Sequence, residues 1–503
     1  MSQLKPHTRP FLSSARLLPV LLACCSNIPA WADENPAHVE LNGKVSSRAG
    51  EFEFVNGVPT AASSADLFEA MDFQRAAQVY LWSLPAMGLK GWENANVDAG
   101  ASPELDGQFV IYQGYDGVAG IMTPNQTVKY IIAFVDTAKF GPAVWEVPPG
   151  LTAGYVGDQW QRPILDCGVA GPEKGQGTKL LIVGPGQEVP KHDPSEFKVV
   201  HSPTNVVWLG TRNMETEPAK IKAVNEGFDA YPFNRPELKN RPMLEKTSHA
   251  FIQAQPHGMA FWENMNAIIQ REVMEERDVF FWAMLKNLGI EKGKPFKPNE
   301  KEKAMLLEAE RLGYLMAVNN TFKKRFDGAN YYGDRNWYVA LVNDPMQKQE
   351  SHGELDERAS WFHEAIGSTY AMKLDGPGPG STYLGSYEDT EGRGYDGGKT
   401  YKLNVPAKVP AGQFWSVSIY NSQNRTLISN DQKRAEINSI NGLVQNDDGS
   451  TDVFIGPKAP EGMESNWVKT SPGQTWFTYF RLYNPEQAFF DKSWKLNDIS
   501  ELK

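Results

Sequence analysis

An aromatic and basic cluster near the C-terminus has the residue types that most clearly suggest chemistry. Its members lie in two strand-like segments and in the loops beside them: Trp415, Tyr420, Arg425, Asn466, Trp467, Arg481 and Tyr483. Aromatic faces stack on flat ligands and sugars, and a guanidinium group binds a carboxylate through a planar pair of hydrogen bonds. The same residue types also fill sandwich cores, where a buried arginine pairs with an acid. A ligand site and a structural role are therefore both open for this cluster.

A second candidate site lies on a predicted helix, where charged residues surround a histidine. These residues are Glu354, Asp356, Glu357, Arg358, His363 and Glu364. His363 and Glu364 would serve as acid and base, because imidazole titrates near neutral pH. A hydrolase or lyase that uses this pair, with nearby carboxylates, is the alternative to a ligand-binding protein. A charged, solvated helix face explains the same residues without catalysis.

Carboxylates also gather in two loop regions near the C-terminus. They are Glu388, Asp389, Glu391, Asp396, Asp447, Asp448 and Asp452. Oxygen ligands of this kind suit calcium, but their spacing does not match the EF-hand loop. Solvated turns are the alternative, so no cofactor is predicted and calcium is the one ion that these loops would suit.

The familiar catalytic signatures are missing from the chain. The sequence HEAIG places Gly367 where a zinc protease needs its second histidine. Neither a G-x-S-x-G elbow nor a phosphate-binding P-loop occurs. The G-x-G-x-x-G match at 392–397 lies in an Asp- and Gly-rich loop and not between a strand and a helix, which indicates a turn.

The first 32 residues predict export. Three basic residues precede the short apolar run Leu17–Cys25, and Ala30-Trp31-Ala32 matches a signal-peptide cleavage site. The apolar run is too short for the roughly 20 residues of a membrane span. We therefore expect a periplasmic or secreted protein, cleaved near Ala32. A weak lipoprotein box that ends at Cys24 gives lipid anchoring as a minor alternative.

Charge and cysteine content limit the partners and the means of stabilisation. The formal net charge of −11 disfavours nucleic-acid binding, which depends on a basic surface. Once the leader is removed, Cys167 is the single cysteine left, so no intramolecular disulfide forms and Cys167 is expected to be a small buried apolar residue. A small molecule is the expected partner, and self-association through sheet edges stays open.

Hydrophobic periodicity divides the chain into segments of different character. Residues 33–65 are polar and predict a flexible N-terminus, and apolar residues at helical spacing then predict a helix that ends at Pro85. Short β-branched and aromatic runs separated by turn residues make 66–215 a β module. The charged, proline-rich stretch from 216 to about 245 predicts a linker, and helical patterns fill the remainder up to 380.

The strand rhythm returns in residues 381–503. In the segment 413–420, alternate residues place Phe414, Ser416, Ser418 and Tyr420 on one face and Trp415, Val417 and Ile419 on the other, as in a strand with a buried face. The polar residues after Tyr420 then form its turn. The expected fold is mainly β: two jelly-roll-like β-sandwich modules joined by an α-helical segment.

Several long motifs resemble two known domain families. The stretches TPNQTVKYIIAFVDTAKFGPAVWEVPPG (123–150) and WQRPILDCGVAGPEKGQGTKLLIVGPGQ (160–187) are similar to DUF1254. LDERASWFHEAIG, YDGGKTYKLNVP, FWSVSIYN, NDDGSTDVFIGP and NWVKTSPGQTWFTYFRLYNPE resemble DUF1214. This resemblance implies an exported bacterial protein with two β-rich modules and no assigned activity. Some members have Asp-Thr after the Pro-Asn pair where this chain has Gln126 and Thr127, so a role for that Asp does not transfer.

Taken together, the residues favour an exported protein that binds a small organic or saccharide ligand at its C-terminal sandwich. The motivating features are the leader, the strand rhythm and the aromatic and basic cluster. Whether the protein also catalyses a reaction is open.

Overall fold

The computed structural model describes residues 41–246 and 251–502. It consists of two units, Met1–Met71 and Asp72–Lys503. The leader, its cleavage site and Cys24 lie outside the described residues, so the predicted export is an expectation to which the structure adds nothing. Over the described residues, none of the helices combines the length and apolar character that crossing a membrane requires.

The first unit contains a small antiparallel sheet. Its strands are β1 (Gly43–Ser47), β2 (Gly50–Val55) and β3 (Val58–Pro59). Phe52 is the buried residue of these three strands, and most of the other side chains are exposed. A flexible segment was expected here. The structure instead shows regular antiparallel strand pairing. This pairing is formed by backbone hydrogen bonds, and few side chains of the three strands are buried.

The helix α1 (Ala61–Asp98) follows and is longer than the sequence predicts. We expected it to end at Pro85, yet Pro85 lies inside it. Proline removes one backbone donor, which weakens the helix locally. Nearby carbonyls have side-chain partners, since Arg358 donates to the Trp82 carbonyl (2.9 Å) and Gln161 to that of Pro85 (2.5 Å). Burial of the helix on both sides of the proline stabilises its continuation.

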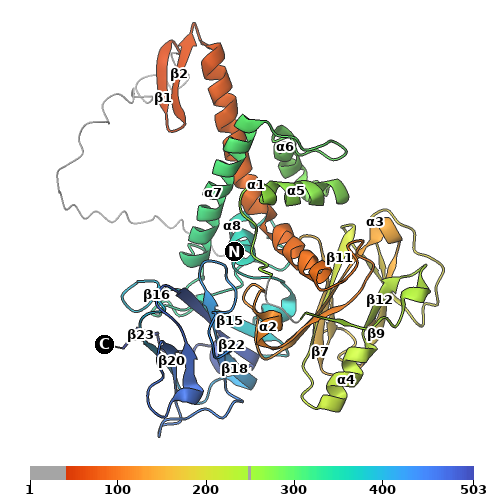
Figure 1. Cartoon of the computed structure of the whole chain (residues 1–503), viewed down its shortest axis with the longest axis vertical. Coiled ribbons are helices and arrows are strands. Elements are labelled where there is room, and N and C mark those ends of the chain that lie inside the picture. The colour runs from red at the N-terminus through yellow and green to blue at the C-terminus, as the bar shows by residue number, and fades with distance from the viewer. Residues whose placement is uncertain (1–40, 247–250, 503) are drawn as a thin grey trace, which may run out of the picture. The chain divides into compact units, whose positions relative to one another are not determined.

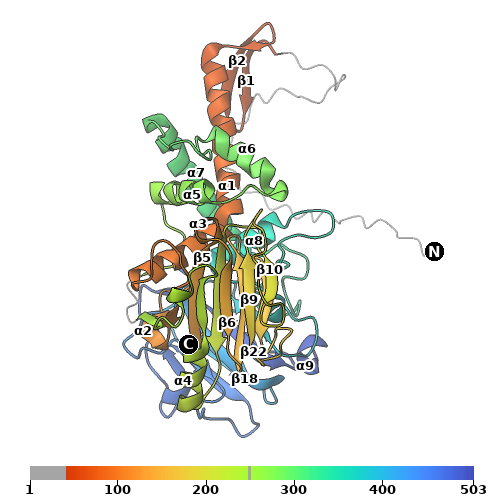
Figure 2. The same cartoon turned by 90° about the vertical axis from the view of Figure 1, so that its right-hand side faces the viewer.

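The first sandwich consists of a six-stranded and a four-stranded sheet (Figures 1 and 2). The six-stranded sheet has the order β13 (Leu244–Lys246), β4 (Val110–Tyr112), β5 (Lys129–Asp136), β11 (Val206–Asn213), β7 (Thr152–Asp158) and β8 (Pro163–Gly168). The four-stranded sheet has the order β10 (Lys198–His201), β9 (Thr178–Val183), β6 (Ala143–Val147) and β12 (Asp229–Pro232). Two short helices, α2 (Gly114–Val118) and α3 (Thr137–Phe140), lie in the connections.

Strand alternation assigns the two faces of the six-stranded sheet. Ile131 and Val135 of β5, with Val207 and Leu209 of β11, point to the core between the two sheets. The buried Cys167 belongs to that core, as expected for a small apolar residue, and burial raises the pKa of its thiol. The intervening residues therefore point the other way, out of the sandwich.

The stretch expected to be a linker belongs to the first sandwich. It contains α4 (Pro218–Gly227), β12, the 3-10 helix η1 (Pro236–Leu238) and β13. β12 pairs with β6, and its one proline is the last residue of the strand, where a missing donor costs little. The prolines and charged residues of this stretch therefore lie in short elements and turns at the edges of the first sandwich, and they do not indicate a boundary between modules.

Helices connect the two sandwiches, as the periodicity predicted. They are α5 (Met259–Arg271), the 3-10 helix η2 (Glu276–Asp278), α6 (Val279–Asn287), α7 (Glu300–Phe322) and α8 (Leu355–Glu364). α7 begins with a capping box in which Asn299 accepts from the Glu302 backbone and the Glu302 side chain accepts from that of Asn299.

The second sandwich also has a larger and a smaller sheet. The larger has the order β14 (Tyr338–Val339), β15 (Ser381–Ser386), β22 (Thr475–Pro485), β18 (Ala411–Asn421) and β19 (Glu436–Asn438), with β16 (Tyr395–Asp396) also paired to β22. The smaller has the order β21 (Trp467–Lys469), β20 (Thr451–Gly456), β17 (Tyr401–Val405) and β23 (Ser500–Glu501). Three short helices lie in this part of the chain: the 3-10 helices η3 (Tyr370–Met372) and η4 (Glu464–Asn466), and α9 (Gln487–Phe490).

The strand predicted at 413–420 is confirmed as part of β18, and residues 415–420 are all buried. Trp415, Val417 and Ile419 lie in the core. On the opposite face, the Tyr420 hydroxyl donates directly to the Pro124 carbonyl of the first sandwich. Ser418 is connected to the first sandwich through Arg481, which donates both to Ser418 and to the Thr123 carbonyl. The fold is therefore mainly β, with two sandwich modules joined by helices, as expected.

Glu272, at the C-terminal end of α5, connects this helix to the first sandwich. It is fully buried, and its carboxylate accepts from the backbone N–H groups of Asn205 (2.7 Å) and Val206 (3.1 Å). Burial raises its pKa to about 7. Between about pH 4.5 and 7 the folded protein holds a proton that the unfolded chain has lost, so this group lowers stability as the pH rises.

We expect Glu272→Gln to remove that dependence. Relative to the variant, the wild type should lose about 3 kcal/mol of unfolding free energy between pH 4.5 and pH 7. Urea unfolding of both proteins at several pH values measures the difference. Parallel stability curves over this interval would show that Glu272 titrates normally.

A candidate ligand site between the two sandwiches

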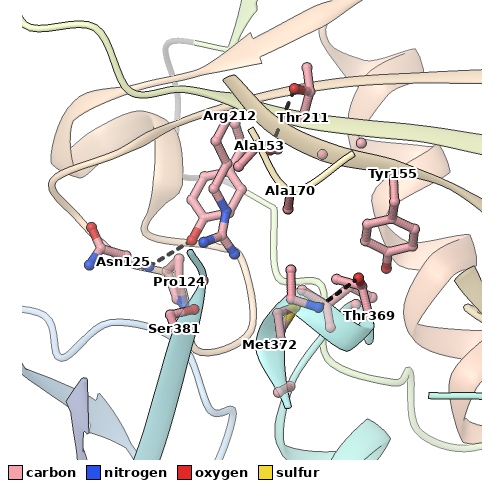
Figure 3. Close-up of a pocket in the computed structure, with 18 of the residues that line it drawn as sticks. Pro124, Asn125, Ala153, Tyr155, Ala170, Thr211, Arg212, Thr369, Met372 and Ser381 are labelled. Atoms are coloured by element: carbon pink, nitrogen blue, oxygen red, sulfur yellow. Dashed lines mark hydrogen bonds between the residues drawn. The ribbon is translucent and has the colours of Figure 1, made fainter. Parts of the chain in front are cut away.

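A cavity lies between the outward face of the first six-stranded sheet and the facing sheet of the second sandwich (Figure 3). Its volume is ≈ 130 Å³. An engineered apolar cavity of roughly 150 Å³ holds benzene, so this space is of the size that accepts an aromatic ring. Its walls are largely apolar, with contributions from Trp92, Ile121, Ile132, Trp208, Trp361 and Ile366.

Strand periodicity explains which side chains reach the cavity. On β11, Trp208, Gly210 and Arg212 share the face opposite to the sandwich core, and on β22 Tyr479, Arg481 and Tyr483 do the same. Two sheets thus present an arginine each to one space. Gly210 is required there, because a Cβ at this position would lie 2.8 Å from the Trp208 indole.

The loop before β5 forms one end of the cavity. The Asn125 carboxamide oxygen accepts from the backbone N–H groups of Thr127 (2.7 Å) and Val128 (3.0 Å), which fixes the turn. Its backbone N–H donates to the Tyr130 hydroxyl (2.8 Å), and its side-chain amide donates to that of Tyr483 (2.6 Å). Both phenol oxygens accept from Asn125, and within the described residues neither hydroxyl donates a hydrogen bond, so both protons are available for a ligand.

Arg481 is almost completely buried and has well-defined partners. Nη1 donates to Ser418 Oγ (2.8 Å) and to Tyr420 Oη (2.5 Å), and Nη2 donates to the Thr123 carbonyl (2.7 Å). Ser418 in turn donates to Glu436 (2.7 Å), so a carboxylate balances this guanidinium through one intervening hydroxyl. Burial and these contacts make Arg481 a connection between the sandwiches as well as a cavity wall.

Arg212 has a different environment. Its guanidinium lies over the Tyr130 ring, 5.1 Å from the centroid. Among residues 41–246 and 251–502, nothing forms a hydrogen bond or an ion pair with this side chain. Figure 3 shows it on the same side of the cavity as Pro124, Asn125 and Ser381. Arginine stays protonated in proteins, so this end of the cavity has a positive charge without a bound acid.

The opposite end of the cavity has Tyr155 and Thr369, as Figure 3 shows. Thr369 donates to the carboxylate of Asp166, which also lines the cavity, and accepts from the Ala371 backbone (3.3 Å). Burial raises the pKa of Asp166, although its hydrogen bond to Thr369 opposes the shift. The Tyr155 hydroxyl accepts from the Ser368 backbone N–H (3.0 Å).

Of the seven aromatic and basic residues predicted to bind a ligand, Arg481 and Tyr483 line the cavity. Tyr420 lies behind them, where its hydroxyl donates to the Pro124 carbonyl (2.8 Å) and accepts from Arg481. These three residues are therefore brought together as the sequence pattern suggested, although at the junction of both sandwiches.

The other four, Trp415, Arg425, Asn466 and Trp467, do not line the cavity and have structural partners. Trp415 stacks on Phe480 with centroids 5.6 Å apart, in the core. Asn466 is fully buried and exchanges hydrogen bonds with the Val444 backbone (2.8 and 2.9 Å). Trp467 donates to the Gly456 carbonyl (2.8 Å).

The predicted acid and base, His363 and Glu364, are fully buried and line no part of the cavity. His363 Nδ1 lies 2.9 Å from Thr321 Oγ1, and burial, with the charge of Arg425, keeps the pKa of its imidazole well below the ordinary range. Glu364 pairs with Lys324 (3.0 Å) and accepts from Tyr387 (2.6 Å) and Tyr479. The geometry therefore connects Glu364 to the cavity only through the hydroxyl of Tyr479.

The loop carboxylates that would suit calcium are spread over separate contacts. Asp389 pairs with Arg393 (2.9 Å), and Asp452 accepts from Asn404 (2.7 Å). Within the described residues, no three histidine, cysteine or carboxylate side chains form a group suited to a metal ion.

Sequence reasoning missed Arg212, Asp166, Tyr130, Tyr155 and Tyr383. A signal for Arg212 is present in the segment NVVWLGTRN, because a charged residue follows the apolar run of this strand on the same face as Trp208. The other four residues have no comparable local signal.

Two family models match the chain, both described as protein of unknown function. DUF1254 matches residues 107–232 and DUF1214 matches residues 380–487. The resemblance inferred from the motifs is thus confirmed for both families. The first match ends with β12 and the second begins just before β15, so the two models cover most of the two sandwiches and leave out α5, α6, α7 and α8 between them.

Two solved structures are similar to the chain. The crystal structure of the VPA0106 protein from Vibrio parahaemolyticus has a TM-score of 0.53 at 15% identity, covering 86% of this chain and 100% of the other. An uncharacterized protein from Burkholderia cenocepacia has a TM-score of 0.38 at 12% identity, covering 88% and 97%. The first likeness supports the fold alone. No curated protein matches this chain.

The residue Arg425, predicted to bind a ligand, has structural partners. Its guanidinium donates to the His363 carbonyl (2.9 Å), to Gln255 (2.8 Å) and to the Gln423 carbonyl (2.5 Å), and the side chain is buried. We expect Arg425→Met to lower the unfolding free energy by about 3 kcal/mol or more, since these acceptors lose their donor.

Urea unfolding measures that loss. The matched control is Arg325→Met, because Arg325 is largely exposed and its pair with Asp356 (2.8 Å) is a solvent-screened surface contact that contributes little to stability. Equal, small losses in both variants would mean that Arg425 does not stabilise the fold.

Proposed function

The chain carries a DUF1254 and a DUF1214 domain, and we propose that the cavity between these domains binds a small organic anion with an apolar, ring-sized body. The observation that carries this proposal is Arg212, a guanidinium that lines the cavity without a hydrogen bond or ion pair from any residue the structure describes. Arginine is the preferred partner of planar carboxylates because its fork of donors matches their two oxygens.

The balance of charge around the anion end supports a single negative charge on the ligand. Arg481 is balanced by Glu436 through Ser418, as described above. Arg212 has no such partner, so one positive charge remains. Burying an unpaired charge is costly, and a bound monoanion would offset that cost.

The remaining donors at this end suit the same kind of ligand. The hydroxyl groups of Tyr130 and Tyr483 accept from Asn125 and donate to no residue that the structure describes, so their protons can be donated to a ligand. Tyr383 also lines the cavity and shares a hydrogen bond with Ser381 (2.5 Å). An anion here would meet a guanidinium and neutral phenols, which are hydrogen-bond donors without a competing charge.

The apolar walls determine the body of the ligand. Trp92, Trp208 and Trp361 all line the cavity. Such surfaces favour a flat apolar group, and small-molecule sites combine walls of this type with a few polar groups that fix orientation. A small carboxylic acid with an aromatic ring meets both requirements.

Benzoate and its neutral isostere benzamide are suitable probes. We expect calorimetric titration of the wild type to give a Kd for benzoate at least tenfold lower than for benzamide, because a hydrogen bond to a charged group contributes about 1.5–3 kcal/mol. In Arg212→Met the two Kd values should lie within about threefold.

The control for this experiment is Arg325→Met, which removes an arginine far from the cavity and should keep the wild-type preference. Thermal unfolding of each variant shows whether the fold is intact. Failure of benzoate to bind, or a preference for benzoate that persists in Arg212→Met, would contradict the proposal.

A further inference from the structure

The end of the cavity opposite Arg212 contains an acid that the proposed anion does not use. Asp166, on β8, lines the same cavity. One of its carboxylate oxygens accepts from Thr369, and the other has no hydrogen bond or ion pair within the part of the chain that the structure describes. The free carboxylate oxygen is therefore an acceptor that lacks a donor among the described residues.

Asp166 is held in this position by its surroundings. The Thr369 hydroxyl both donates to Asp166 and accepts from the Ala371 backbone at the start of η3. Neighbouring Gly367 has a φ of +79°, and a Cβ there would lie 3.0 Å from the Tyr155 hydroxyl and 3.2 Å from the Trp208 ring. The backbone at this end thus approaches the cavity closely, and the acid does not rotate freely.

Two opposite charges therefore line one cavity without pairing. Arg212 and Asp166 form no ion pair with each other. Arg212 lies at the end that has Asn125 and Ser381, whereas Thr369, the partner of Asp166, lies with Tyr155 at the other (Figure 3). A ligand that spans the space would meet a cation at one end and an acceptor at the other.

We propose that the ligand is a ring-bearing carboxylic acid with a hydrogen-bond donor, a hydroxyl or an ammonium group, at the end opposite its carboxylate, and that Asp166 accepts from that donor. This inference rests on the proposed anion site, since the carboxylate on Arg212 orients the molecule. It adds the second point of recognition and so defines the class of ligand as hydroxy acids or amino acids with an apolar body.

The state of Asp166 distinguishes the two donors. Burial raises the pKa of Asp166, so its carboxylate becomes neutral at a higher pH than that of an exposed aspartate does. An ammonium group gains from the charge and a hydroxyl depends mainly on the acceptor. The advantage of an ammonium ligand should therefore fade as the pH falls through the pKa of Asp166.

The test compares benzoate with its 3- and 4-hydroxy and its 3- and 4-aminomethyl derivatives, by calorimetric titration of the full chain. In the wild type, at least one derivative should bind about tenfold or more tightly than benzoate. Asp166→Leu removes the acceptor, so the derivatives should then bind no better than benzoate. Asp166→Asn keeps an acceptor and the shape, and should remove mainly the advantage of the aminomethyl derivatives.

Asp193→Asn is the control, because Asp193 is an exposed aspartate whose partner is Ser195 in the same turn, and it should change no ratio. The inference is overturned when benzoate binds in an Arg212-dependent way but no derivative gains, or when the gain survives both Asp166 variants. Absence of benzoate binding would instead overturn the anion site itself, and with it this inference. Because affinities are compared as ratios within one variant, a variant that is merely less stable still gives a decisive result.

Discussion

The burial of Arg481 between two β-sheets is the constraint on which the rest of the site depends. A guanidinium group that leaves water must recover its hydrogen bonds within the protein. Here the recovery involves both sandwiches, because two acceptors come from β18 and the third is the carbonyl of Thr123, in the loop before β5. That loop is thereby fixed against the second sandwich, and it holds Asn125, which donates to the hydroxyl groups of Tyr130 on β5 and Tyr483 on β22.

Arg212 and Arg481 are the same residue type, and their hydrogen-bond partners distinguish a ligand-binding role from a structural role. Both lie on sheet faces that point away from their own sandwich cores, and both line the cavity. Arg481 has hydrogen bonds from each terminal nitrogen and a carboxylate one hydroxyl away, which are the contacts of a structural group. Arg212 lies over the face of Tyr130 and has no hydrogen bond or ion pair within the part of the chain that the structure describes. The same contrast separates Asp158, which pairs with Arg162, from Asp166, which has a free oxygen.

Much of the fold could be predicted from local patterns. Alternation predicted the two faces of β18, and helical spacing predicted α5, α6, α7 and α8, because each of these depends on residues close together in the chain. Pro85 and the stretch from 216 to 245 were misleading for a physical reason. A proline lowers the local stability of a helix or strand because it lacks a backbone donor, and a charged residue is costly to bury. Tertiary packing around α1 and β12 outweighs these local effects.

The cavity was not accessible to the same reasoning. Tyr130 and Tyr483 share hydrogen bonds with Asn125 although hundreds of positions separate them in the chain, and no local pattern shows which sheet faces meet. Arg481 and Tyr483 were identified by their chemistry, but the aromatic residues of strand cores and loops, Trp415 and Trp467, have the same composition. Burial and hydrogen-bond partners separate the two groups, and only the folded arrangement provides them.

The loop of residues 121–126 has a consequence for how this protein matures. Its carbonyls are acceptors for side chains that are encoded about three hundred residues later, so a nascent chain completes its N-terminal half with those acceptors still hydrated. The recognition surface comes into existence only when synthesis is finished and the halves have docked. Either half made separately would have an incomplete cavity: the first sandwich would keep Arg212 and Asp166 but would lack the wall that Tyr383, Arg481 and Tyr483 supply.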